Sequence, residues 1–251
     1  AEARVEHGPP ASAPYQRPRQ SPFVRLGKRL RDPVNAWFAH QSLIDTGPMV
    51  NPADLAGLEA LQRDWRGIRD ELQSLLAGGE DIPSFGRISP DHRRIASGPQ
   101  WKSFFFYGYG YRARENCAKC PHTSALLEQV PGLVVAFFSI LDGDAQIPPH
   151  RGLTKAWINC HLGLVVPTAA AGSACEIEVD GRISRWREGE WMVFDETYRH
   201  RVWNTTGSRR VVLMLQVERP MRWPGRIAAA ALRWIISRTS FVKDVRRALD
   251  R

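Results

Sequence analysis

The sequence predicts a mainly β fold with flanking helices, in which the strands form a jelly roll or barrel. After Gly132 the chain runs through short apolar segments in which period two dominates, as in half-buried strands. Gly and Pro turns separate these segments at the density typical of a jelly roll or barrel. Helical periodicity before residue 101 and after residue 220 predicts helices that cover the outside of the barrel.

The length of the chain indicates one domain with extensions. Its 251 residues, 43% of them hydrophobic, can bury one substantial core but do not suggest two equal domains. We expect a disordered lead at 1–22, a helical extension at 23–100, the β domain at 101–220 and basic helices at 221–251. The lead is rich in Pro, Ala and charged residues and has too few large apolar side chains to offset its ordering entropy.

Positive charge is concentrated near both ends of the chain. The formal charge is +9, and the excess lies in Gln16–Arg31 and Arg222–Arg251. Such charge attracts an anionic partner, but a nucleic-acid reader more usually sets its basic residues on one folded face. The distribution therefore argues against nucleic acid and leaves open a peripheral contact between the basic helices and a membrane.

Other bulk features predict a cytoplasmic protein, with peripheral association at the inner membrane as the alternative. No stretch reaches the ~18 to 20 apolar residues that span a bilayer, and the first residues lack the apolar core of a secretory signal. Four cysteines are too few for a disulfide scaffold of this length.

Two helices are predicted before residue 101. Val24–Phe38 places apolar groups among Arg and Lys at helical spacing, which fits either a helix packed on its own domain or one on a partner or membrane surface. A second helix opens at Asn51-Pro52, where Asn caps and Pro suits the first turn, and it ends at Gly78-Gly79. Its apolar positions are Leu55, Leu58, Leu61, Trp65, Ile68, Leu72, Leu75 and Leu76.

The remaining elements follow in order. The aromatic, glycine-interrupted segment Trp101–Tyr111 predicts a strand whose backbone closely approaches another strand or a bound group. Asp180-Gly181 predicts a two-residue hairpin, and Glu188-Gly189-Glu190 predicts another reversal. The predicted strands are Leu133–Leu141, Ala156–Pro167, Glu176–Asp180, Arg182–Trp186, Trp191–Phe194 and Arg210–Val217; the predicted helices are Pro121–Val130, Ile227–Ile236 and Phe241–Leu249.

The strand-rich half contains three histidines, His150, His161 and His200. Neutral imidazole binds Fe(II), Zn and Cu alike, and two ligands from non-adjacent strands of a barrel would leave several coordination positions open. The common facial triad has Asp or Glu two residues after its first histidine, but Gly152 stands there. From the residues alone, a two-histidine metal site and structural histidines both remain possible.

The segment Cys117–His122 invites a zinc or redox interpretation. Zinc would need two further ligands, and Cys160 and Cys175 fall on other predicted strands without paired spacing. Structural thiols are therefore favoured over a metal site at Cys117 and Cys120.

Several separated blocks between Trp101 and Pro220 resemble one family. The strings PPHRGLTKAWINCHLGLVVP and GEWMVFDETYRHRVWNTTGSRRVVLMLQVERP are similar in order and spacing to the aspartyl/asparaginyl β-hydroxylase family, which includes bacterial lipid A hydroxylases. The resemblance implies a double-stranded β-helix with a cupin-like core. It also implies an oxygenase that uses Fe(II), 2-oxoglutarate and O2 to hydroxylate an sp3 carbon.

Matching motifs assign roles to five residues. By this resemblance His150 and His200 bind iron, and Arg210 pairs with the distal carboxylate of 2-oxoglutarate through the fork of its guanidinium. Ser139 shares that carboxylate, and His161 contacts the end of the keto acid that chelates iron. The alternatives are a solvated Arg210, a barrel-wall hydroxyl at Ser139 and a core histidine at His161.

Two positions depart from the family pattern in a way that bears on the substrate. Relatives have arginines suited to an acidic substrate where this chain has Trp157 and Asn159. Loss of these charge-assisted partners argues against an aspartyl residue of a protein as the substrate. Arg151 and Lys155 are near enough in sequence to supply positive charge instead, or they are solvated loop residues.

The resemblance leaves three functions open. Hydroxylation of an amino-acid or peptide-derived small molecule is favoured. An acyl chain of lipid A or a related lipid is the alternative. FDETY, NTT and VERP resemble the lipid branch more closely, whereas Gly152 is typical of the aspartyl branch and argues against it. A non-catalytic, cupin-like binding module is the alternative from another class.

Overall fold

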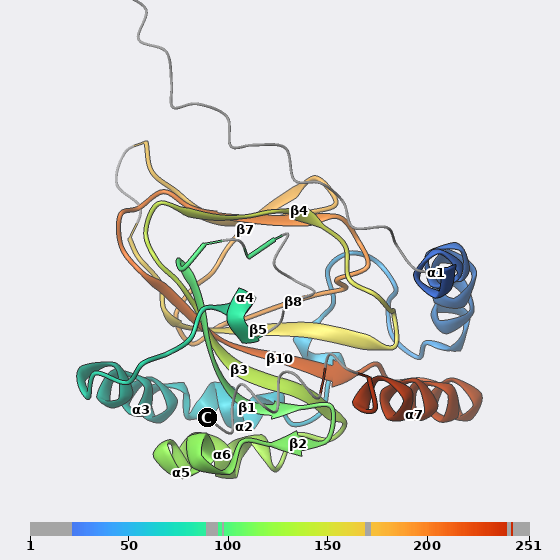
Figure 1. Cartoon of the computed structure of the whole chain (residues 1–251), viewed down its shortest axis with the longest axis horizontal. Helices are drawn as coiled ribbons and strands as arrows, with labels where there is room; N and C mark the ends of the chain where they lie inside the picture. Colours follow the sequence, from blue (N-terminus) through green and yellow to red (C-terminus); the bar gives the residue numbers. More distant parts are fainter. Residues whose placement is uncertain (1–21, 89–94, 97, 169–171, 240–241, 243–251) are drawn as a thin grey trace, which may run out of the picture.

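The structure, a computed structural model, describes residues 22–88, 95–96, 98–168, 172–239 and 242 (Figure 1). The lead expected at 1–22 lies outside the described residues except for Pro22. The helix expected at Phe241–Leu249 lies outside them except for Val242. Within the described part of the chain, no helix is both long and apolar enough to cross a bilayer.

The described strands form two antiparallel sheets that face each other as a double-stranded β-helix, which confirms the predicted mainly β, cupin-like fold (Figure 1). The larger sheet has the order β2-β1-β3-β10-β5-β8, and the smaller has the order β4-β9-β6-β7. The strands are β1 (Trp101–Gly108), β2 (Tyr111–Arg112), β3 (Leu133–Leu141), β4 (Ala145–His150), β5 (Trp157–Val165), β6 (Cys175–Val179), β7 (Arg182–Arg185), β8 (Trp191–Phe194), β9 (His200–Asn204) and β10 (Arg210–Glu218).

Helices pack against the outer face of the larger sheet and at its ends, except for the short α4 (Phe85–Ile88), which lies between the two sheets with Phe85 stacked on Trp101 and Phe105 (Figure 1). Leu58, Leu61, Ile68 and Leu72 are buried in one apolar cluster with alternate residues of β3, β5 and β10. The helices are α1 (Pro22–Gln41), α2 (Leu58–Arg63), α3 (Trp65–Ala77), α4 (Phe85–Ile88), α5 (Arg114–Lys119), α6 (Pro121–Leu127) and α7 (Trp223–Ser237).

Two strands, β4 and β9, were missed by the sequence prediction. β4 contains Pro148 and Pro149, which lack the N–H that a strand donates and therefore argue against a strand. They are tolerated because β4 is an edge strand of the smaller sheet, and its pairing with β9 is irregular between Ile147 and His150. β9 has only five residues, so its alternating burial pattern gives a weak signal.

The single helix predicted from Asn51 to Gly78 is wrong. The chain forms a 3-10 turn (Pro52–Asp54), then α2, then α3. Asn51 caps as predicted, since its side chain accepts a hydrogen bond from the N–H of Ala53. Gly57 interrupts the helix with a φ of 86°, at a point where the backbone lies against Pro131. The apolar periodicity therefore runs through separate helical segments and does not mark one continuous helix.

The close backbone approach predicted for the aromatic segment is also wrong. β1 and β2 form a hairpin through Tyr109 and Gly110, whose φ angles are 49° and 84°. A Cβ at Gly108 or Gly110 would meet nothing within 4 Å, so Gly110 serves the turn and not a close contact. The Asp180-Gly181 hairpin between β6 and β7 is confirmed, with both φ angles positive.

Strand alternation gives the barrel a partly polar interior. On β10, Val211 and Leu213 pack toward the helices, whereas Arg210 and Val212 point between the two sheets. On β5 the same alternation sends Asn159 and His161 inward while Cys160 packs outward. The larger sheet therefore places chemically active side chains on the face that looks toward β4 and β9.

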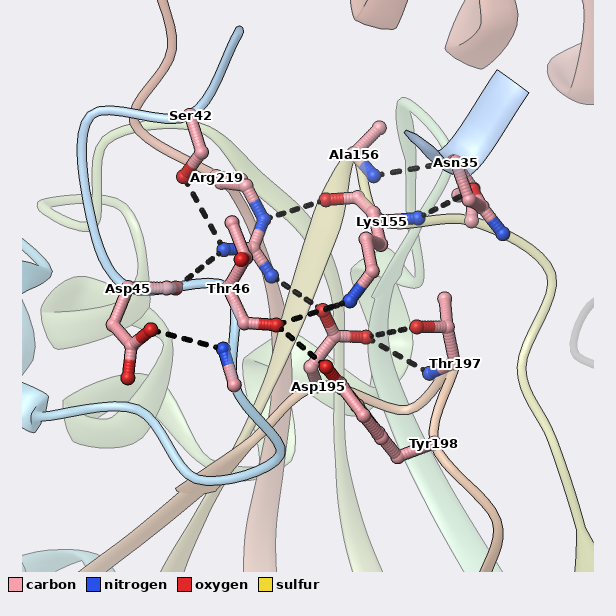
Figure 2. Close-up of polar contacts among 12 residues, drawn as sticks. Asn35, Ser42, Asp45, Thr46, Lys155, Ala156, Asp195, Thr197, Tyr198 and Arg219 are labelled. Carbon is pink, nitrogen blue, oxygen red and sulfur yellow. Dashed lines mark hydrogen bonds and ion pairs between the residues drawn. The ribbon is translucent and has the colours of Figure 1, made fainter. Parts of the chain in front are cut away.

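A buried charge cluster holds the loops beside the barrel mouth (Figure 2). Oδ2 of Asp195 lies 2.6 Å from Nη2 of Arg219 and 2.7 Å from Nζ of Lys155, and the Asp195 and Arg219 side chains are fully buried. Oδ1 of Asp195 accepts hydrogen bonds from the N–H and hydroxyl of Thr197. One carboxylate thus fixes the loop before β9 and the loop after β4.

The same cluster ties the N-terminal segment to the barrel (Figure 2). Arg219 donates to the carbonyl oxygen of Asp45, and Lys155 donates to that of Thr46. On α1, the side chain of Asn35 accepts a hydrogen bond from the N–H of Lys155 and donates to the carbonyl oxygen of Leu153. The segment after α1 is therefore part of the framework around the site.

We predict that Asp195→Ala lowers the free energy of unfolding by about 3–5 kcal/mol, because it leaves the Arg219 charge buried without its partner. Urea denaturation measures the loss. The control is Asp32→Ala, which removes an exposed ion pair with Arg31 and should change stability by less than about 1 kcal/mol. Equal effects of the two variants would contradict a structural role for the cluster.

Candidate active site

Two imidazoles face each other at the barrel mouth. His150 ends β4 and His200 begins β9, and the two residues are direct register partners. Their ring centroids are 4.1 Å apart. The expectation of non-adjacent strands is therefore corrected, because the two histidines come from neighbouring, antiparallel strands.

Backbone carbonyls orient both rings. Nδ1 of His150 lies 2.8 Å from the carbonyl oxygen of Pro148, and Nδ1 of His200 lies 2.9 Å from that of Tyr198. A neutral ring that donates from Nδ1 carries its lone pair on Nε2, which is the arrangement usual for metal-binding histidines. Burial lowers the pKa of His200 to about 4, and the neighbouring His150 adds to this effect, so the His200 ring is neutral at pH 7.

Arg210 is a buried cation with unused donors. Its side chain is 1% exposed, and its guanidinium lies 4.6 Å from the centroid of the Trp186 ring. Burial lowers its pKa to about 10, so it stays charged at pH 7, and a hydrogen bond with the Cys175 thiol opposes the shift. Nε and Nη1 have no hydrogen-bond partner among the described residues. A buried charge without partners costs several kcal/mol, which indicates a site for an anion.

His161 lies between the histidine pair and Arg210. Its ring contacts Phe194 edge-on, with centroids 5.1 Å apart, and stacks near Trp186 at 6.1 Å. Burial holds its pKa well below the usual value, and the charges of Arg210 and His200 contribute in the same direction. Its Nδ1 is buried and has no partner among the described residues, so it offers a second polar atom for a ligand.

Ser139 occupies the same interior face as Arg210. It pairs with Val212 across β3 and β10, and Val212 and Arg210 alternate on one side of the strand. The buried Ser139 hydroxyl accepts a hydrogen bond from Nε1 of Trp101 at 3.0 Å. A hydroxyl can still donate its own proton to a second partner.

The residues considered for substrate binding lie in three different environments: an apolar cluster, an exposed loop and the buried charge cluster. Trp157 is buried in the apolar cluster that contains Phe137, with its ring edge-on to Tyr109. Arg151 is exposed in the loop after His150. Lys155 is committed to Asp195, so it belongs to the framework and does not supply charge to a substrate.

Glu196 is a site residue that the sequence analysis missed. Its Oε2 accepts hydrogen bonds from Asn159 at 3.1 Å and Gln216 at 2.9 Å. Burial raises the pKa of its carboxyl to about 7, although both amides oppose the shift. Its position in the loop directly before His200, within the string FDETY, was the available signal.

Glu196 also explains the glycine that replaces the triad carboxylate. A Cβ at Gly152 would lie 2.3 Å from Cγ and Cδ of Glu196, a distance that real contacts do not reach. The backbone N–H of Gly152 donates to the carbonyl oxygen of Glu196 at 2.6 Å. An aspartate at position 152 therefore has no room unless the Glu196 side chain moves.

Larger metal clusters are absent from the part of the chain that the structure describes. No three His, Cys, Asp or Glu side chains there are grouped so that they could hold a metal ion. Cys117 and Cys120 are buried free thiols, and burial raises the pKa of Cys120 to about 12, which disfavours the thiolate that zinc requires. The structural role expected for these cysteines stays a prediction.

Comparison with known proteins gives one family. The family model described as Aspartyl/Asparaginyl beta-hydroxylase matches residues 62–220. The chain is 34% identical over 197 residues to the ornithine lipid ester-linked acyl 2-hydroxylase of Rhizobium tropici, which covers 78% of this chain and 69% of that protein. It is 27% identical over 172 residues to the human aspartyl/asparaginyl beta-hydroxylase, covering 66% of this chain and 22% of that protein.

Solved structures with similar topology are distant. KdgF from Halomonas sp. is 15% identical with a TM-score of 0.31, covering 49% of this chain and 83% of that one. The cupin domain of Schizosaccharomyces pombe Cnp3 is 11% identical with a TM-score of 0.32, covering 51% of this chain and 77% of that one. The fold assignment rests on the strand pairing described above.

We predict that Gly152→Ala lowers the free energy of unfolding by about 1–3 kcal/mol, because the new methyl group displaces Glu196 from its amide partners. In a Glu196→Ala background the same change should cost much less, which a double-mutant cycle in urea measures. Gly108→Ala, where a Cβ meets open space, is the control. Additive effects of the two changes at positions 152 and 196 would refute the steric conflict.

Proposed function

Because this chain belongs to the aspartyl/asparaginyl β-hydroxylase family and is thereby a hydroxylase, we propose that it uses Fe(II), 2-oxoglutarate and O2 to hydroxylate an sp3 carbon. The observation that carries this proposal is the interior of the barrel. Two oriented imidazoles share it with a buried guanidinium, two of whose donors have no partner among the described residues. Neutral imidazoles suit a ferrous ion, among other metals, and a buried guanidinium suits a carboxylate.

The residues fit the iron as a two-histidine site. His150 and His200 would hold Fe(II) through Nε2, and the carbonyl oxygens of Pro148 and Tyr198 keep both rings in orientation. With no carboxylate at Gly152, more positions on the metal stay open than in a facial triad.

The residues also fit the keto acid. Arg210 would bind one carboxylate through Nε and Nη1, the buried donors that have no partner among the described residues. The Ser139 hydroxyl lies on the same face to share it, and Nδ1 of neutral His161 is available nearer the histidine pair. When bound, iron and 2-oxoglutarate supply the oxidising power, whereas the protein positions the reactants.

Apolar rings shield this interior from water. Phe194 contacts both His161 and His200, with ring centroids 5.1 Å and 5.3 Å away, and Trp186 covers the guanidinium of Arg210. A dry site strengthens the ionic contact of Arg210 with a carboxylate and protects reactive species from side reactions.

For the substrate we favour an acyl chain over an acidic amino acid. Asn159 is committed to Glu196 and Lys155 to Asp195, and Trp157 is buried among apolar residues. Leu153, three residues after His150, is 55% exposed and offers apolar surface beside the site. The relative from Rhizobium tropici is named as an acyl 2-hydroxylase, which supports the same choice. An amino-acid or peptide-derived small molecule is the second candidate.

The test is incubation of the protein with Fe(II), 2-oxoglutarate and O2 in the presence of a lipid extract or an amino-acid mixture. We expect succinate release that depends on Fe(II), together with a product that has gained one oxygen atom in mass spectra of the lipid fraction. A gain of oxygen only in the amino-acid fraction would reverse the substrate preference. Binding of both cofactors without turnover on either mixture would favour the cupin-like binding module.

We predict that His200→Ala reduces Fe(II) binding at least about a hundredfold and abolishes succinate release, because one imidazole ligand remains. Anaerobic equilibrium dialysis measures the metal. The control is His122→Ala, which removes a half-exposed histidine paired with Asp64 and should leave both quantities unchanged. Normal iron binding by His200→Ala would show that the metal site is elsewhere.

We predict that Arg210→Ala raises the Kd of 2-oxoglutarate by about two orders of magnitude, because the carboxylate loses two charge-assisted hydrogen bonds. Calorimetric titration of the metal-loaded protein measures this Kd. Arg209→Ala is the matched control, since this neighbouring arginine is half-exposed and paired with Asp142. A similar loss in both variants would mean that general charge, and not the buried fork, binds the keto acid.

A further inference from the structure

Helix α7 turns its large apolar side chains to solvent. Trp223, Ile227, Trp234 and Ile235 are 55 to 72% exposed. The intervals between successive residues are four, seven and one, so the four side chains lie on one side of the helix. A helix on a globular domain normally buries this side, and exposed apolar patches of this kind mark interaction sites.

The opposite side of α7 is the one that packs on the domain. Gly225 and Ala229 are buried, and a Cβ at Gly225 would lie 2.7 Å from the Cβ of Gln41 at the end of α1. The packing side combines these small residues, which bring the helix close to the fold, with Leu232 and Ile236, which pack against the same apolar cluster as Ala229. The outward position of the tryptophans and isoleucines therefore follows from how α7 is held.

Helix α1, which lies at the same end of the molecule as α7 (Figure 1), has exposed apolar side chains of its own. Leu30, Val34 and Trp37, at spacings of four and three residues, are 42 to 49% exposed. The two helices are joined where α1 ends and α7 begins, because the N–H of Arg222 donates to the carbonyl oxygen of Gln41. We call the seven exposed side chains of α1 and α7 the apolar face.

Positive charge accompanies the apolar face. Arg222, Arg226, Arg233 and Arg238 occur between residues 222 and 239, a segment that contains no Asp or Glu, and of these Arg233 forms an ion pair with Glu218 at 3.0 Å. The guanidinium of Arg238 lies 3.7 Å from the centroid of the Trp234 ring, which places charge directly on the apolar face. Exposed tryptophan and isoleucine on one helix side, flanked by arginines, are typical of helices that lie in the interface of an anionic membrane.

Helix α1 contacts the loop that follows His150. The buried side chain of Asn35, on the side of α1 that faces the domain, donates to the carbonyl oxygen of Leu153. Leu153 is itself exposed and lies three residues beyond His150. Helix α1 therefore links the apolar face to the loop that carries one of the histidines.

We propose that the apolar face docks on the surface of an anionic lipid bilayer. Burial of the tryptophans and isoleucines in the interface would supply the apolar contribution, and the arginines would supply attraction to acidic headgroups. A second copy of the chain fits less well, because a two-fold contact through this face would bring the positive charge of one copy, including Arg238, close to that of the other. Docking would also bring an acyl chain of the membrane to the active site, and this step rests on the proposed function.

The test is cosedimentation of the full chain with vesicles of phosphatidylcholine mixed with phosphatidylglycerol, compared with vesicles of phosphatidylcholine alone. We expect binding to the mixed vesicles that decreases as salt is raised. The triple variant Trp223→Ser, Ile227→Ser, Trp234→Ser should bind at least about tenfold more weakly, because it loses most of the apolar burial. Ile183→Ser is the matched control, since Ile183 is 60% exposed on β7 in the other sheet, and it should bind like the unaltered protein.

Three outcomes would overturn the proposal. They are no binding to mixed vesicles, equal binding by the triple variant, and equal loss of binding in Ile183→Ser. Light scattering of the unaltered chain tests whether a second copy covers the apolar face instead. If the unaltered protein is a dimer and the triple variant, but not Ile183→Ser, is a monomer, the face is a protein interface. Arg210→Ala should bind vesicles normally, so vesicle binding is measured separately from turnover, and either proposal can fail without the other.

Discussion

The structure depends on one buried carboxylate, that of Asp195, which pairs with two cations at once. It neutralises Arg219 and Lys155 at once and orders the turn at Thr197. Through these partners it joins the loop after β4, the loop before β9 and the segment after α1. Because His150 and His200 stand at the ends of these two loops, their facing arrangement depends on an ion pair that contacts neither ring.

The two buried arginines at the two ends of β10 differ in their partners, and this difference points to a ligand at one of them. Arg210 and Arg219 are both buried, at the start of β10 and directly after its end. Arg219 finds a carboxylate and three oxygen acceptors within the chain, including Asp195 and the carbonyl oxygen of Asp45. Arg210 has a ring, a thiol and two unused donors. Since folding gains nothing from burying such a charge alone, the cost at Arg210 supports the proposal that this arginine binds an anion.

The sequence predicted the fold better than it predicted the site. Long apolar strands such as β3 and β10 were found because burial on both faces gives a strong local signal. β4 and β9 were missed because prolines at a sheet edge and a five-residue strand give almost none. Consequently the pairing of His150 with His200 could not be derived from spacing, and only the resemblance to a family suggested it. Glu196 was missed because its importance depends on contacts with residues on three other elements.

The contacts of Glu196 also bear on the conflict between the two branches of the family. Gly152 resembles the aspartyl branch, but here a side chain at that position would overlap Glu196, so packing against Glu196 offers a second reason for the glycine besides the branch of the family. Asn159 stands where relatives have an arginine for an acidic substrate, and its amide is used by the same carboxylate. An acidic substrate that reached Asn159 would therefore find its amide already bound to the Glu196 carboxyl group, and it would find no guanidinium there. This is the physical reason to favour an uncharged acyl chain as the substrate in our proposal.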